Sequence, residues 1–147
     1  MSGIDINSGL LDINVPGLPR PQGSMRGFKV GGRVQMVHSN HNDLAVWRHA
    51  VTSAAADAWG DRPLLDEAVG IRLLFHLPRP KSAPKRRVYP DRLPDLDKLA
   101  RAVLDSLTGV VITDDARVVS LHAAKDYAVV GPAGCTILLC PMSEVES

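Results

Sequence analysis

The chain has 147 residues, the size of one ordinary domain, so one hydrophobic core and a single domain over residues 1–147 are expected. Hydrophobic residues make up 45% and charged residues 22%, which is close to average globular usage and excludes wholesale disorder and fibrous repeats. The net charge of +1 gives by itself no reason to expect a nucleic-acid partner. No apolar run reaches the roughly 20 residues that span a bilayer, so we expect a cytoplasmic protein with no membrane partner.

The N-terminal part carries two strand patterns. Residues 1–12 read as a loose lead-in, and the segment LDINVPG reads as a short strand that opens into a loop rich in proline and glycine. Residues 28–37 have the composition of a second strand, interrupted by two glycines. Between Asp12 and Asp43 the only charged residues are basic, which suits a polyanionic partner: Arg20, Arg26, Lys29 and Arg33.

A long helix is predicted over residues 41–59. Ser39 or Asn40 can cap it, and Gly60 with Pro63 can end it. Both tryptophans of the chain lie on this helix and fit the core or a subunit contact better than base stacking. The apolar residues recur at helical spacing, namely Leu44, Trp47, Val51, Ala54, Ala55 and Ala58.

A buried strand and a basic loop follow. Residues 69–77 alternate apolar side chains with others, which is the period of a strand with one buried face. Residues 78–94 then carry five prolines and no apolar periodicity, so an exposed basic loop is expected. A solvated linker and a DNA-binding segment are both open interpretations of this loop. The acidic motif that follows favours DNA contact through Lys85, Arg86 and Arg87.

The last third of the chain predicts a second helix and short strands. Strands are expected at residues 110–112, 118–123 and 135–139, the first two joined by a turn. Gly109 can end the helix, whose apolar face comprises Leu96, Leu99, Ala100, Val103 and Leu107. The sequence therefore predicts an α+β fold, with two main helices packed on a small mixed sheet.

Neither the cysteines nor the histidines form a metal-binding pattern. Cys135 and Cys140 are five residues apart, so in a strand they point to opposite faces and cannot form a disulfide. Two buried, reduced thiols are expected instead. The five histidines show no paired spacing, and we interpret them as structural or surface residues.

Two acidic pairs carry the chemistry that the sequence suggests. Asp95 and Asp97 share one side only where the chain is extended, so the helix should start near Asp97. Asp114 and Asp115 follow in a turn. Carboxylates brought together repel one another unless a cation neutralises them. Oxygen donors favour Mg²⁺, with Mn²⁺ as a possible substitute, and such an ion can activate a water for attack on a phosphodiester.

Two cations lie close to the first acidic pair. Arg101, one helical turn after Asp97, can stabilise negative charge in a transition state, and Lys98 can share this task. Each feature also has a simpler interpretation: a chance DxD, turn aspartates, or a surface ion pair. Their joint spacing favours one site.

The segment PDLDKLARAVLDSLTGVVITDDARVV resembles the RusA family of Holliday junction resolvases, with weaker support from VPGLPRPQGS and the order of elements. The resemblance implies that Asp95, Asp97 and Asp115 bind the catalytic Mg²⁺. Asp114 is then a turn residue or lies outside the direct ligands. The resemblance extends to Lys125 in HAAKDY, which we expect to contact a DNA phosphate.

The chain departs from the family at two positions. The family usually has Asn after the second Asp of the DxD and Lys four residues after that Asp, where this chain has Lys98 and Arg101. Arginine keeps the positive charge but cannot act as a transferable proton source, so a general-acid role at this position is doubtful.

The resemblance also implies a substrate and an assembly. A four-way junction has approximate two-fold symmetry, and resolving it requires two symmetric cuts, which a C2 homodimer supplies. We expect Mg²⁺-dependent nicks that leave 5′-phosphate and 3′-hydroxyl ends, in DNA recombination and repair, without a small-molecule cofactor. The family is common in phages and prophages. The alternatives are a non-catalytic DNA-binding module and a nuclease that prefers flaps or forks.

Overall fold

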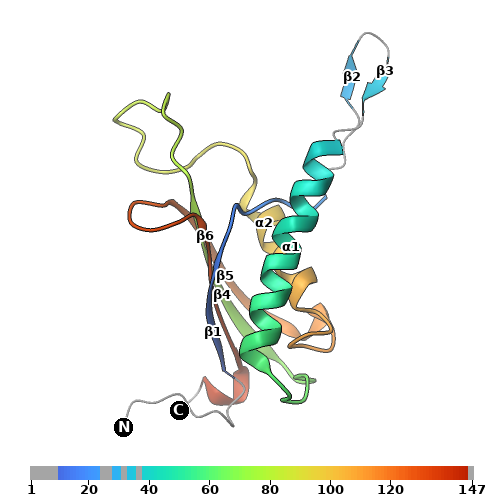
Figure 1. The fold of residues 1–147 in the computed structure, drawn as a ribbon. Helices are drawn as coiled ribbons and strands as arrows, with labels where there is room; N and C mark the ends of the chain where they lie inside the picture. Colours follow the sequence, from blue (N-terminus) through green and yellow to red (C-terminus); the bar gives the residue numbers. More distant parts are fainter. Residues whose placement is uncertain (1–9, 24–27, 31–32, 36–37, 146–147) are drawn as a thin grey trace.

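The computed structural model describes residues 10–23, 28–30, 33–35 and 38–145. Two helices, α1 (His38–Trp59) and α2 (Leu96–Leu107), lie on the same side of a four-stranded sheet (Figure 1). The strands of this sheet, in their spatial order, are β1 (Leu11–Pro16), β6 (Gly134–Pro141), β4 (Val69–Leu77) and β5 (Val118–Tyr127). The β4–β5 pair is parallel, and the other two pairs are antiparallel. The predicted α+β fold with a small mixed sheet and two helices is confirmed.

Two short strands and two 3₁₀ turns are the remaining elements of the described chain. Strands β2 (Phe28–Val30) and β3 (Arg33–Gln35) form a separate antiparallel ribbon beyond the N-terminal end of α1 (Figure 1). Two 3₁₀ turns, η1 (Asp115–Arg117) and η2 (Met142–Glu144), precede β5 and follow β6. In the described part of the chain, no helix is long and apolar enough to cross a membrane.

The core lies between the sheet and the two helices. Strand β4 turns Ile71, Leu73 and Phe75 toward the helices, and each is at most 3% exposed, as the alternating pattern predicts. From the helices, apolar side chains spaced three or four residues apart meet this face: Trp47, Val51 and Ala55 from α1, and Leu99, Val103 and Leu107 from α2. Both tryptophans are buried in the core, which confirms one of their two expected places.

Phe75 allows a direct test of this core. Its side chain is fully buried in a central strand, so we expect Phe75→Ala to lower the free energy of unfolding by about 3–5 kcal/mol. The neighbouring Leu74 points to the other face and is 38% exposed, so Leu74→Ala should cost about 1 kcal/mol or less. Urea denaturation of the two variants measures the difference, and equal losses would contradict this placement of the core.

Several predicted boundaries differ from the structure. Helix α1 begins at His38, so the backbone of Ser39 and Asn40 is helical rather than capping, and Trp59 rather than Ala58 is buried at its C-terminal end. Strand β1 begins at Leu11, where the predicted strand in LDINVPG begins, so only the expected lead-in is two residues too long; its residues 1–9 lie outside the described part of the chain. The strand expected at residues 28–37 is two short strands, and residues 31–32 and 36–37 also lie outside the described part.

The C-terminal strands also differ from expectation. Residues 110 and 111 form a tight turn rather than part of a strand, because the N–H groups of Val110 and Val111 bond back to the carbonyl of Leu107 at the end of α2. Ile112 takes part only in isolated β-bridges. Strand β5 extends four residues further than predicted, because its parallel pairing with β4 continues to Tyr127. Strand β6 is one residue longer than predicted at its start and two at its end.

The cysteines lie on opposite faces of β6, as predicted, and both are free. Cys135 is buried in the core, and burial raises the pKa of its thiol to about 12, so it stays protonated at neutral pH. Cys140 is only half-buried, so the expectation of two buried thiols is correct for Cys135 alone. The reason is that Cys140 belongs to the sheet face that the helices do not cover.

Candidate active site

The first acidic pair lies where α2 begins. Asp95 is the N-cap residue, with an extended backbone (φ −69°, ψ 136°), and Asp97 lies in the first helical turn. The carboxylate of Asp95 makes no capping hydrogen bond, and both aspartates are exposed. Helix α2 therefore starts one residue before the expected position. Neither the helix cap nor burial therefore keeps these two carboxylates from an outside partner.

Lys98 is the nearest cation to this pair. Its Nζ lies 3.5 Å from a carboxylate oxygen of Asp95, in a pair whose side chains are 31% and 47% exposed. An exposed pair of this kind stabilises the fold by at most about 1 kcal/mol, so a DNA phosphate or a metal ion can replace either partner. The expected contact of Lys98 with DNA and its share in the electrostatic role of Arg101 stay predictions.

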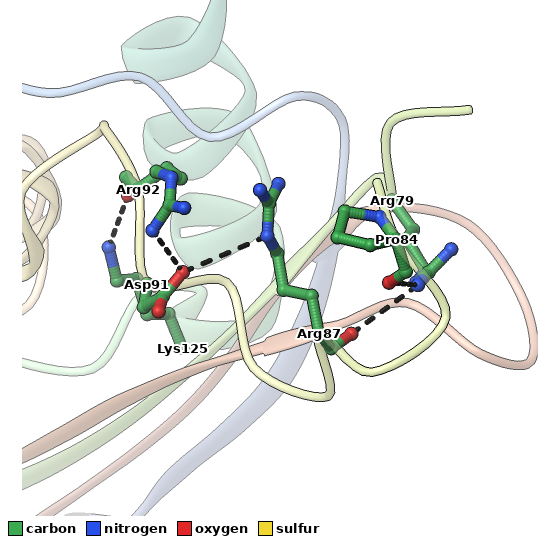
Figure 2. A network of polar contacts seen from close by, with 6 residues as sticks. All are labelled: Arg79, Pro84, Arg87, Asp91, Arg92 and Lys125. Carbon is green, nitrogen blue, oxygen red and sulfur yellow. Dashed lines mark hydrogen bonds and ion pairs between the residues drawn. The ribbon is translucent and has the colours of Figure 1, made fainter. Parts of the chain in front are cut away.

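The segment before Asp95 is held by a lysine from the sheet. Lys125 on β5 donates hydrogen bonds from Nζ to the carbonyl oxygens of Arg92 (2.7 Å) and Pro94 (2.8 Å). Figure 2 shows the first of these contacts. Lys125 was expected to contact DNA, whereas two of its three N–H donors are used inside the protein. Sequence reasoning missed this role, because it depends on the pairing of Lys125 with the buried Phe75, which turns Lys125 toward the helices and is set only by the folded sheet.

The second acidic pair lies at η1. Asp114 caps this turn by accepting a hydrogen bond from the backbone N–H of Ala116 (3.0 Å), and this bond lowers the pKa of Asp114. A hydrogen bond with Asp114 raises the pKa of the neighbouring Asp115, and repulsion from Asp114 and Asp105 adds to the effect. Asp114 therefore has the expected turn role, and Asp115 is the member of the pair that a bound cation would stabilise most.

Helix α2 contributes two charged residues to the surroundings of Asp115 in η1. Arg101 lies near enough to Asp115 to lower the pKa of its carboxyl group, while Asp105 raises it. Asp97, Arg101 and Asp105 follow one another at intervals of four residues, so they lie on one side of α2. Arg101 is thus placed between the two acidic pairs. Asp105 is a further acidic residue of the site that sequence reasoning did not select.

The η1 turn is braced from the segment before β4. Asp66 accepts hydrogen bonds from the Thr113 hydroxyl (2.8 Å) and from Nε of Arg117 (2.8 Å). These contacts lower the pKa of Asp66. The hydrogen bond from Thr113 has the largest effect, and the hydrogen bond and positive charge of Arg117 add to it. Backbone bonds from Leu65 to Val111 and from Thr113 to Leu65 hold the same segments together. Asp115 is therefore presented on a fixed turn rather than on a loose loop.

This brace has a testable pH dependence. Because the pKa of Asp66 is lowered in the folded protein, its contribution to stability is present above the unfolded value of 3.8 and is lost as the pH falls through the folded value. We expect Asp66→Asn to lose less stability than the wild type on acidification from about pH 5 to pH 3. Urea unfolding at several pH values measures this difference, and parallel curves for both proteins would contradict it.

The basic loop is organised by its own side chains (Figure 2). Arg79 donates hydrogen bonds to the carbonyl oxygens of Pro84 (2.6 Å) and Arg87 (3.4 Å). Asp91 lies 2.9 Å from the guanidinium of Arg92 and 4.0 Å from that of Arg87. Most side chains of residues 78–94 are exposed, Lys85 and Arg86 among them, while Ala83 and Pro90 are buried. Together with the contacts of Lys125, these bonds join the loop to the start of the acidic motif.

The site is built from oxygen donors and cations. Within the part of the chain that the structure describes, no three His, Cys, Asp or Glu side chains are gathered closely enough to hold a metal ion by themselves. The structure places Asp95 and Asp97 together at the start of α2, and Asp115 beside Arg101 and Asp105. Acidic residues on an α+β scaffold beside exposed basic segments suit a hydrolase that cleaves nucleic-acid phosphodiesters.

Comparison with known protein families shows to which family of such hydrolases the chain belongs. The family model of the endodeoxyribonuclease RusA matches residues 16–137, which is most of the chain, and so the chain belongs to the RusA family. No curated protein is significantly similar to the chain. The protein is therefore an endodeoxyribonuclease, a hydrolase acting on DNA, of a family that acts on Holliday junctions and generally requires a divalent metal. The alternative of a non-catalytic DNA-binding module is set aside by this membership.

Proposed function

We propose that this protein resolves four-way DNA junctions by paired, Mg²⁺-dependent cuts, in DNA recombination and repair, with Asp95, Asp97 and Asp115 as the metal ligands. The observation that carries the proposal is the presentation of Asp95 and Asp97. Both are exposed at the start of α2, and the Asp95 carboxylate is not used to cap the helix although Asp95 is the N-cap residue. Exposed carboxylates at a helix start, one of them in an exchangeable ion pair with Lys98, are suited to bind a cation within the part of the chain that matches the family.

The donor set fits Mg²⁺, and Mn²⁺ as its substitute. All three proposed ligands are carboxylates, which hard divalent ions prefer. Mg²⁺ in proteins is commonly held by one or two carboxylates, with waters and substrate phosphates completing the shell. A site whose carboxylates are divided between α2 and η1 fits this mode, in which the DNA strand contributes ligands. When bound, the ion supplies an activated water and stabilises the departing oxygen.

The other charged residues have supporting roles in this proposal. Arg101, between the two acidic pairs, is placed to stabilise negative charge on the phosphoryl oxygens in the transition state, and Lys98 supplements it. Arginine remains protonated, so Arg101 acts through charge and not by transferring a proton. Lys85, Arg86 and Arg87 would contact phosphates along the DNA. Lys125 positions Asp95, and its remaining N–H donor is available to a phosphate.

The substrate sets a requirement for symmetry. One site cannot reach two opposed strands, and so we propose that the protein acts as a C2 homodimer. Sedimentation equilibrium should then give twice the 15.8 kDa mass of the chain. A mass of one chain, both free and on a junction, would contradict the dimer.

One cleavage assay tests the proposed substrate. A synthetic four-way junction, a flap, a fork and a linear duplex, each end-labelled, are incubated with the protein in Mg²⁺ and separately in EDTA. We expect two symmetric cuts in the junction, slower or no cutting of the other DNAs, and no product in EDTA. Faster cutting of the flap or the fork would assign the protein to the alternative substrates, and cutting in EDTA would remove the metal from the proposal.

A further inference from the structure

A hollow of about 610 Å³ opens beside the acidic motif. One wall is the segment after β1, residues 18–21, and the other is the basic loop over residues 78–94. Asp95 and Lys98 lie on its edge, so the hollow adjoins the proposed catalytic carboxylates. Its volume lies within the range of small-ligand sites. The hollow is therefore too small for a DNA duplex but large enough for one nucleotide.

Both walls are fixed in place by contacts already formed. The first wall is held at its two ends, since Gly17 N–H donates to the carbonyl of Ala133 (3.0 Å) and Gln22 N–H donates to that of Lys98 (3.0 Å). The second wall is held by Lys125 and by Arg79, whose guanidinium also stacks over the Tyr127 ring at 5.7 Å. The hollow is thus preformed, which lowers the entropic cost of filling it.

The lining combines an apolar floor with a cationic rim. Pro19, Leu77, Pro90 and Tyr127 are buried and form apolar surface, and Leu93 on the rim is 84% exposed. The charged lining residues are four cations and one carboxylate, namely Arg20, Arg87, Arg92, Lys98 and Asp95. The cations are paired with exposed aspartates at 2.9 to 4.0 Å, and such pairs exchange for phosphates at little cost.

We propose that this hollow receives one unstacked nucleotide of the DNA strand that is cut, with its base on the apolar floor and its phosphates on the cationic rim. This inference rests on the proposed nuclease function and extends it to the part of the substrate that the protein grips. The net positive rim matches a phosphodiester chain, and a flat aromatic base matches a floor of prolines and a tyrosine. The branch point of a junction supplies bases that unstack at low cost.

The test removes one base at a time. A four-way junction carrying a single abasic nucleotide at each position around the cut is titrated with the protein in EDTA, so that binding is measured without cleavage. For the wild type, one position next to the cut should weaken binding about tenfold, the scale of one lost base-stacking contact.

A variant that fills the hollow is compared with a control variant that carries the same new side chain elsewhere on the surface. Leu18 lines the hollow and is 44% exposed, so Leu18→Trp places a ring in it. Val145 is 52% exposed and directly follows η2, and the ribbon of η2 after β6 lies away from the basic loop (Figure 1), so Val145→Trp is the control. We expect Leu18→Trp to bind the intact junction about tenfold more weakly and to lose the response to the abasic position, while Val145→Trp keeps both. Leu93→Asp, an exposed change on the rim, should weaken binding without affecting the fold.

The outcomes separate this inference from the proposed function. If no abasic position changes the affinity, or if Leu18→Trp binds as the wild type does and keeps the abasic response, the nucleotide site is wrong. If the base dependence is found but no branched DNA is cut in Mg²⁺, the proposed resolvase activity fails while the nucleotide site stands.

Discussion

Asp97→Asn is expected to bind a four-way junction as tightly as the wild type and to cut it about 100- to 1,000-fold more slowly in Mg²⁺, the loss typical of removing one electrostatic stabiliser of a transition state. The change replaces one carboxylate oxygen by an amide nitrogen with almost no change of shape. Asp97 is exposed in the first turn of α2, so the fold should tolerate the substitution. The expected loss is therefore one of chemistry and not of structure.

The measurement for Asp97→Asn is single-turnover cleavage, with junction binding followed separately in EDTA. Asp12→Asn is the matched control, because Asp12 is an exposed aspartate on β1, a strand at the opposite edge of the sheet from β5. We expect this control to cut as the wild type does. Cleavage by Asp97→Asn at a rate near that of the wild type would remove Asp97 from the metal site.

Lys125→Met is expected to lower the cleavage rate about 10- to 100-fold with little change in junction affinity, the range for residues that orient metal ligands. The ammonium of Lys125 holds the carbonyl oxygens of Arg92 and Pro94, which immediately precede Asp95. Without it, those carbonyls lose a charged donor and Asp95 loses its fixed position. The variant should therefore also need a higher Mg²⁺ concentration for half-maximal cleavage, an effect that a general loss of stability would not produce.

The same variant discriminates between the two interpretations of this lysine. A residue that only contacts phosphate would weaken junction binding and reduce its dependence on salt, with the Mg²⁺ requirement unchanged. Lys125→Arg keeps a charged donor and should restore part of the cleavage rate. A loss of affinity with an unaltered Mg²⁺ requirement would contradict the positioning role and support the DNA contact inferred from the sequence.

Local patterns predicted the elements that carry the acidic motif. The alternation through Ile71, Leu73 and Phe75 predicted β4, and the spacing of Leu99, Val103 and Leu107 predicted α2, because burial on one face imposes a period on the sequence. The two-residue spacing of Asp95 and Asp97 also placed the start of α2 within one residue.

Contacts between distant segments were beyond the reach of these patterns. Residues 110–112 have a strand-like composition, yet backbone bonds to Leu107 close the first two into a turn, and only an isolated β-bridge joins Ile112 to Leu65. The bonds of Lys125 join residues 31 and 33 positions apart, and no local period encodes such a pairing. The hollow between residues 18–21 and the basic loop likewise depends on two segments that meet only in the folded chain.

We propose that carboxylates from α2 and η1 bind one divalent ion on DNA. The most direct test of this proposal is Mn²⁺ binding to the protein–junction complex, measured by electron paramagnetic resonance against the junction alone. We expect the wild type and Asp12→Asn to bind Mn²⁺ beyond the amount held by the DNA. Asp95→Asn, Asp97→Asn and Asp115→Asn should each lose this additional ion while still binding the junction. Retention of the ion by all three variants, at the affinity of the wild type, would contradict the account.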